Sequence, residues 1–135
     1  MLRIISLVFA LCALAACGGP SEFVVVGTAR AVGADGLVTM EKADGNNLVN
    51  ISLENLPPPG RVSDGATVYA VWFKPQGTTP QMQGSLDYDP DARTGTLQAT
   101  TPHLALELVI SAEVDATVNS PSDVVIVRQE ISAPE

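Results

Sequence analysis

The stretch HLALELVI, residues 103–110, decides the fold class. Its larger aliphatic side chains recur at every second residue, namely Leu104, Leu106, Leu108 and Ile110. Successive side chains of a β-strand point to opposite faces, so this period of two predicts a strand with one apolar face. No other part of the chain sustains the period as long, and the stretch therefore predicts a β-sheet protein.

Shorter segments of the same kind lie on both sides of this stretch. Turn residues separate them, and Asp44–Asn47 has strong hairpin chemistry. We expect strands near residues 23–26, 37–42, 49–53, 66–74, 81–88, 96–99, 103–110 and 123–128. Pro57–Gly60 predicts an extended crossover, because proline cannot donate to a central strand. The chain is predicted to be an all-β sandwich of seven or eight antiparallel strands, with a barrel as the alternative.

The first residues have the layout of an export signal. Arg3 precedes an uncharged run, Ile4–Ala16, of about 13 residues, which is shorter than the ~20 residues that a membrane-spanning helix needs. The run ends in Leu14-Ala15-Ala16-Cys17, which resembles the bacterial lipobox. We therefore predict a helical lipoprotein signal peptide over residues 1–16, with Cys12 as part of its apolar core.

The lipobox resemblance implies a lipid anchor. In proteins with this motif, the thiol corresponding to Cys17 carries diacylglycerol and the new amine carries an acyl chain such as palmitate. No other cofactor is expected. Gly18, in the place where an Asp would retain a lipoprotein at the inner membrane, implies the outer membrane, facing the periplasm. The predicted organisation is signal peptide 1–16, acylated cysteine and tether 17–21, sandwich domain 22–130 and flexible tail 131–135.

The charge balance excludes one class of partner. The chain has 7 Lys and Arg against 15 Asp and Glu, a net charge of −8. Such a chain is a poor nucleic-acid binder and is repelled by anionic lipid headgroups, so the anchor must hold it at the membrane. The acids are spread along the sequence, which favours a solvated surface over an acidic docking patch. After cleavage Cys17 is the single thiol, so no intramolecular disulfide is expected.

Several short motifs resemble the extracytoplasmic C-terminal domain of anti-sigma-K factors. They are LENLPP (Leu53–Pro58), YAVWF (Tyr69–Phe73), GSLDYD (Gly84–Asp89), LVISAE (Leu108–Glu113) and the Ser120-Pro121 step. The resemblance implies an immunoglobulin-like sandwich and no catalytic residues. Members of that family place a sigma-binding domain and a transmembrane helix before this domain. Here a lipobox stands in their place, which implies a stand-alone sensory or binding module.

Two clusters of side chains are candidates for chemistry. Asp87, Asp89 and Asp91 alternate as at the start of a calcium loop, but Ala92 and Gln98 stand where an EF-hand needs glycine and glutamate. This site is a weak metal candidate, and a hairpin turn with solvated carboxylates is favoured.

His103 and Glu107 could form a general-base pair on one strand face, although two ordinary surface residues are the favoured interpretation.

The aromatic strand offers a possible ligand or partner face. Tyr69 and Phe73 share one face of it and Trp72 takes the other. Trp72 as a filler between the two sheets is the favoured alternative. The sequence as a whole predicts a non-enzymatic, membrane-anchored envelope lipoprotein that acts as an interaction or structural module with an unidentified envelope protein. A ligand- or calcium-binding sensor is the alternative, and an enzyme ranks third.

Overall fold

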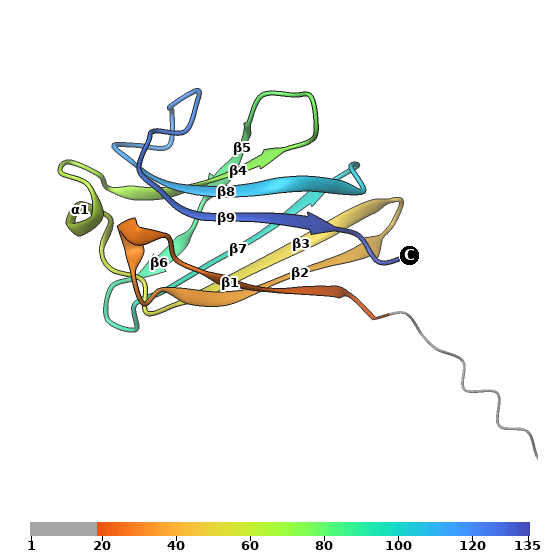
Figure 1. Ribbon diagram of the computed structural model, residues 1–135, viewed down its shortest axis with the longest axis horizontal. Coiled ribbons are helices and arrows are strands. Elements are labelled where there is room, and N and C mark those ends of the chain that lie inside the picture. Colours follow the sequence, from red (N-terminus) through yellow and green to blue (C-terminus); the bar gives the residue numbers. More distant parts are fainter. Residues whose placement is uncertain (1–18) are drawn as a thin grey trace, which may run out of the picture.

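The computed structural model describes residues 19–135, which form two antiparallel sheets packed face to face (Figure 1). The predicted signal peptide and Cys17 lie outside the described residues. The strand order is β1-β2-β3-β7-β6 in one sheet and β5-β4-β8-β9 in the other. Among residues 19–135, no helix is long and apolar enough to cross a membrane.

The elements have these bounds: β1 Ser21–Val26, η1 Ala29–Ala31, β2 Asp35–Ala43, β3 Asn46–Glu54, α1 Pro59–Val62, β4 Val68–Lys74, β5 Gln81–Ser85, β6 Asp87–Asp89, β7 Thr94–Thr101, β8 Ala105–Glu113 and β9 Val125–Ser132.

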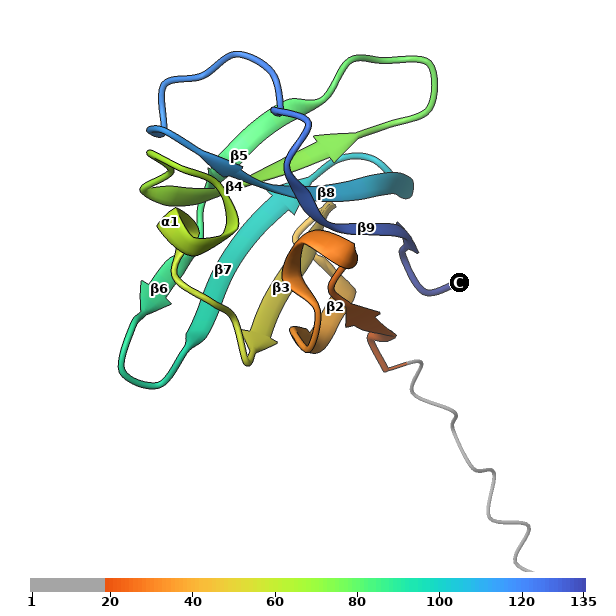
Figure 2. The same ribbon diagram turned by 60° about the vertical axis from the view of Figure 1, so that its left-hand side comes forward.

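The strand order confirms the predicted immunoglobulin-like sandwich. When β2 to β9 are taken in chain order as A, B, C, C′, D, E, F and G, the two sheets become A-B-E-D and C′-C-F-G. This is the immunoglobulin arrangement. Strand β1 is an addition that pairs with β2 at the sheet edge, beside β9 (Figure 2).

Residues 19–135 form nine strands because the segment predicted as one strand, residues 81–88, changes sheets at Leu86. The Leu86 amide still donates to Tyr69 O of β4, at 2.8 Å. The next residue, Asp87, pairs with Thr96 of β7 in the opposite sheet. The Leu86 side chain is buried at this crossing, which joins the two sheets along one side of the sandwich.

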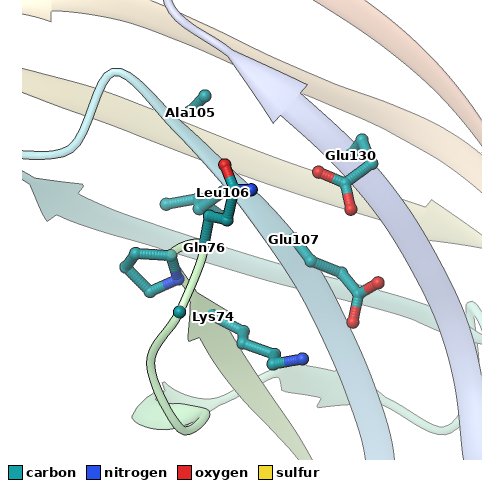
Figure 3. A pocket seen from close by; sticks show the side chains of 8 residues that line it. Lys74, Gln76, Ala105, Leu106, Glu107 and Glu130 are labelled. Atoms are coloured by element: carbon teal, nitrogen blue, oxygen red, sulfur yellow. The ribbon is translucent and has the colours of Figure 1, made fainter.

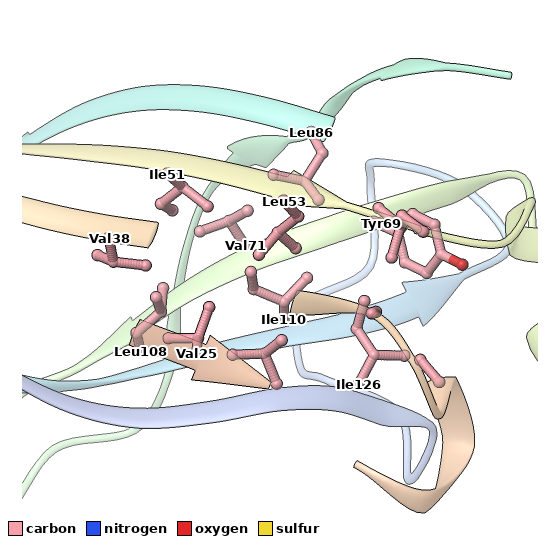
Figure 4. Packing of buried hydrophobic residues seen from close by; sticks show 14 of the residues in the cluster. Val25, Val38, Ile51, Leu53, Tyr69, Val71, Leu86, Leu108, Ile110 and Ile126 are labelled. Atoms are coloured by element: carbon pink, nitrogen blue, oxygen red, sulfur yellow. The ribbon is translucent and has the colours of Figure 1, made fainter. Parts of the chain in front are cut away.

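The core follows the period of two that the sequence predicts. In β8 the side chains of Leu106, Leu108 and Ile110 point between the sheets, where they meet Val38 and Ile51 of the other sheet (Figure 4). Burying an aliphatic side chain of this size stabilises the fold by about 1.5–3 kcal/mol. Leu104, which belongs to the same sequence pattern, is 66% exposed because β8 begins only at Ala105.

Local sequence explains the connections, with one exception. Asp44 and Gly45 have φ values of 50° and 83°, the conformation that a two-residue hairpin loop between β2 and β3 requires. The predicted extended crossover is wrong in part, because Pro59 begins the short helix α1. Proline suits the first helical turn, where its missing N–H has no partner to lose.

The predicted flexible tail 131–135 is also wrong in part. Ile131 and Ser132 belong to β9, and Ile131 is buried in the core. The amide of Ala133 donates to Leu104 O at 2.8 Å. The sandwich therefore extends at least two residues beyond its predicted end.

Candidate functional site

The aromatic strand does not form an exposed face. Tyr69 and Phe73 point into the core between the sheets, and Trp72 points to the other side of β4, as the alternation predicts. All three are buried, Trp72 to 1% exposure, so the predicted aromatic partner face is wrong. The alternative is wrong too, because Trp72 lies on the outer side of the four-stranded sheet and not between the sheets.

A connection covers Trp72 on that outer side. Residues 114–124, here called the strap, join β8 to β9 (Figure 1). Val118 of the strap packs against a small apolar cluster that contains Trp72 and Val109. This cover explains why β4 is apolar on both faces, a pattern from which the sequence predicted only a central position in the sheet.

A chain of hydrogen bonds fixes the strap. Trp72 Nε1 donates to Ser111 Oγ at 2.9 Å, and Ser111 Oγ donates to Glu113 Oε2 at 2.7 Å. The amide of Ser122 in the strap donates to the same carboxylate oxygen at 3.0 Å. Glu113 is buried, so its carboxylate depends on these donors. The arrangement holds the strap in place and leaves no opening to Trp72.

Both tyrosines of the chain secure the connection that leaves β3. The Tyr69 hydroxyl donates to Pro57 O and the Tyr88 hydroxyl donates to Leu56 O, the latter at 2.8 Å. Their rings meet edge to face with centroids 5.9 Å apart. Burial, followed by the neighbouring Tyr88, raises the pKa of Tyr69 well above its usual value of 10, and burial also raises the pKa of Tyr88.

We expect the stability of the fold to decline once the pH rises above about 10, the pKa of an unfolded tyrosine. In that range the unfolded chain releases phenolic protons that the folded chain keeps, so unfolding becomes more favourable with each step in pH. Denaturant unfolding between pH 7 and pH 12, with tyrosinate absorbance recorded in parallel, measures this. Tyr69→Phe should flatten the decline, whereas a folded protein whose two tyrosines titrate freely near pH 10 would contradict the argument.

His103 and Glu107 do not form the general-base pair that the sequence suggested. His103 lies in the exposed β7–β8 connection, and Glu107 Oε1 accepts instead from Arg128 Nη1 at 2.9 Å. Lys74, Glu107 and Glu130 are in register on three neighbouring strands, at a pocket of about 400 Å³ (Figure 3). The pocket thus holds charges of both signs, with cation and carboxylate side by side on an open surface.

The three aspartates of the calcium hypothesis lie at one turn. Asp87 and Asp89 are exposed on β6, and Asp89 Oδ1 accepts from the amides of Asp91 and Ala92 at 2.9 and 3.2 Å. One oxygen of the Asp89 carboxylate is therefore already used to stabilise the turn that connects β6 to β7. Within residues 19–135, no group of three or more His, Cys, Asp or Glu side chains is close enough to hold a metal ion.

The sandwich has one acidic face, which the sequence analysis missed. The outward positions of the five-stranded sheet hold six carboxylates and, within the described strands, no Lys or Arg. The carboxylates are Glu22, Asp35, Glu41, Glu54, Asp87 and Asp89. These acids are far apart in sequence and were predicted to be dispersed. Within each strand these acids occupy the positions that alternate with the buried apolar residues, and that alternation is the signal that could have revealed the face.

Comparison of the chain with protein-family models, with curated proteins and with solved structures finds no match.

Proposed function

We propose that the protein is a non-enzymatic lipoprotein of the bacterial envelope, in which an immunoglobulin-like sandwich, held at the membrane by acylated Cys17, contacts another envelope protein. One observation carries the proposal. Strand β1 begins at Ser21, so only three residues separate the lipobox cysteine from the folded domain. At about 3.5 Å per residue, the sandwich would begin within about 14 Å of the acylated sulfur.

The chemistry of Cys17 supplies the holding force in this proposal. Each buried methylene contributes about 0.8 kcal/mol, and two or more chains give stable anchoring where one gives only marginal binding. Diacylglycerol on the thiol and an acyl chain on the amine meet that requirement. Gly18 favours transport to the outer membrane, where the domain would face the periplasm.

The positions of the chemistry-bearing side chains favour an interaction module over an enzyme. His103 stands apart in an exposed connection, and Glu107 is already paired with Arg128. The aromatic side chains are committed to packing, Trp72 under the strap and Tyr69 between the sheets. What the surface offers instead is an extended sheet face.

The two cysteines of the chain provide a matched experiment. We expect the natural protein, labelled with a palmitate analogue in bacteria, to carry the label and to sediment with membranes. Cys17→Ser should abolish both the label and the membrane association, whereas Cys12→Ser should leave both unchanged. Mass spectrometry of the mature N-terminus then identifies Cys17 as its first residue.

A label lost with Cys12→Ser instead, or a Cys17→Ser protein that stays in the membrane, would contradict the proposed anchor. The interaction is tested by crosslinking in living cells. A stoichiometric partner of the natural protein that Cys17→Ser loses supports the module, and the lack of any partner at adequate expression contradicts it.

A further inference from the structure

We propose that the acidic outer face of the five-stranded sheet, at its β1–β2 corner, is the surface that docks a partner protein carrying basic and apolar side chains on an extended segment. The inference deepens the proposed function and rests on it for the partner's place near the membrane. The exposure, register and charge of side chains on this face define the docking surface itself.

The corner is apolar where an edge strand is usually protected by charge. Val24 and Val26 of β1 are 76% and 69% exposed, and Leu37 of β2 is 39% exposed. Val24 and Leu37 lie opposite each other in the ladder, so they form one patch. Edge strands commonly carry lysine, proline or a bulge at such positions, and an unprotected apolar edge favours association.

Carboxylates with no ion-pair partner among the described residues border this patch, and Asp35 Oδ1 accepts one hydrogen bond from Asn55 Nδ2 at 3.0 Å. Asp35 lies opposite both Val26 and Glu54, which places two carboxylates directly across from each other. Like charges in this arrangement destabilise a sheet. In the part of the chain that the structure describes, Arg128–Glu107 is the one ion pair, and it lies on the other sheet. A basic side chain of a partner would relieve the repulsion between Asp35 and Glu54.

The surface is also shaped to receive a side chain. A hollow of about 220 Å³ lies beside the patch, lined by Leu37, Ser52 and the two carboxylates of Asp35 and Glu54. The stem of a lysine or arginine could lie along Leu37 while its charged group reaches the carboxylates. The hollow thus combines the apolar and acidic features within one site.

Charge selects among the possible occupants. A second copy would bring another acidic face against this one, and an anionic lipid surface or a nucleic acid would meet the same repulsion. The five strands of this sheet contain 35 residues. At about 3.3 Å per residue and about 4.8 Å between strands they present roughly 550 Å², about two thirds of the ~800 Å² that each partner contributes to a standard interface. A cationic protein segment is the occupant that fits this face.

The test uses a defined probe and the full chain in neutral detergent. The probe is a fluorescein-labelled decapeptide of alternating lysine and valine, and lysine–serine and glutamate–valine decapeptides are its controls. Fluorescence anisotropy should show saturable binding of the lysine–valine peptide that weakens with salt, since exposed charges are screened. Both control peptides should bind much more weakly.

Paired substitutions locate the site. We expect Val24→Ser with Val26→Ser, and separately Asp35→Asn with Glu54→Gln, to weaken binding by about tenfold each, as loss of interface apolar or charge contacts does. The matched controls are Leu104→Ser with Val114→Ser, in the β7–β8 connection and the strap, and Asp64→Asn with Glu130→Gln, outside the strands of the five-stranded sheet. Both control pairs should change binding less than about twofold. Circular dichroism checks that every variant is folded.

Several results would overturn the inference. One is a lysine–valine peptide that shows no saturable binding, and another is a set of control pairs that weaken its binding as much as the test pairs do. Binding that only the Asp35→Asn/Glu54→Gln pair weakens would indicate non-specific electrostatic attraction. Sedimentation that shows a dimer lost in Val24→Ser/Val26→Ser would assign the face to a second copy, and binding of the chain to phosphatidylglycerol vesicles through these valines would assign it to lipid. Peptide binding in detergent does not require acylation, so its failure is distinguishable from failure of the Cys17 anchor.

Discussion

Replacing Trp72 by alanine should lower the free energy of unfolding by about 3–5 kcal/mol, the loss expected when a large buried aromatic side chain is removed. The indole lies between the four-stranded sheet and the strap, in one apolar cluster with Val109 and Val118. Its removal also takes away the Nε1 donor from which Ser111 Oγ accepts, while the Ser111 hydroxyl can still donate to Glu113. Thermal or urea unfolding measures the change, and limited proteolysis should show new cleavage within residues 114–124.

Two further variants separate the sources of this loss. Trp72→Phe keeps an aromatic ring under the strap but removes the Nε1 donor, so we expect a loss of about 1–2 kcal/mol from the hydrogen bond, plus the smaller ring's packing. Val114→Ala changes an exposed side chain of the strap and should stay within about 0.5 kcal/mol of the natural protein. If Trp72→Ala costs no more than Val114→Ala, the strap is held by something other than Trp72.

The strap also marks the limit of what the sequence could predict about the aromatic strand. Alternation correctly separates Tyr69 and Phe73 from Trp72, because the period of two is a property of the backbone. It does not say what covers each face. Residues 114–124 have no period and include turn residues, so nothing in them predicts that they fold over Trp72. That contact depends on tertiary packing against residues far away in the sequence.

The difference between local pattern and tertiary contact also explains which strands the sequence predicts. The eight predicted strands correspond to real ones, because most are apolar or alternating runs and all are bounded by turn residues. The ninth arises where residues 81–88 divide at Leu86. The register of β5 shifts at Gln83, between Met82 and Gly84, so the alternation of this segment is interrupted and does not indicate the change of sheet. Local sequence also does not indicate which strands pair with each other. Thus the acids of β1, β2, β3 and β6 were read as dispersed, although pairing collects them on one face.

Gly36→Ala should lower the free energy of unfolding by about 3 kcal/mol, at the upper end of what overpacking costs. Gly36 lies in β2 between Val25 and Leu53 of the two neighbouring strands. An added Cβ would come within 2.1 Å of Ser52 O and 2.9 Å of Leu53 Cα, so the backbones of β2 and β3 would have to part. The matched control is Gly60→Ala, whose Cβ would meet only Ala66 O, at 3.5 Å. It should be neutral or stabilise by up to about 1 kcal/mol.

The effect of Gly36→Ala should extend to the docking surface, because its neighbours Asp35 and Leu37 point to the acidic face. Separating β2 from β3 would move Asp35 away from Glu54 and change the hollow that these residues line. We therefore expect Gly36→Ala to weaken binding of the lysine–valine peptide even at temperatures where the variant remains folded, while Gly60→Ala leaves binding unchanged. A Gly36→Ala protein that keeps both its melting temperature and its peptide affinity would show that the two strands can accommodate the methyl group, and that the hollow does not depend on their close approach.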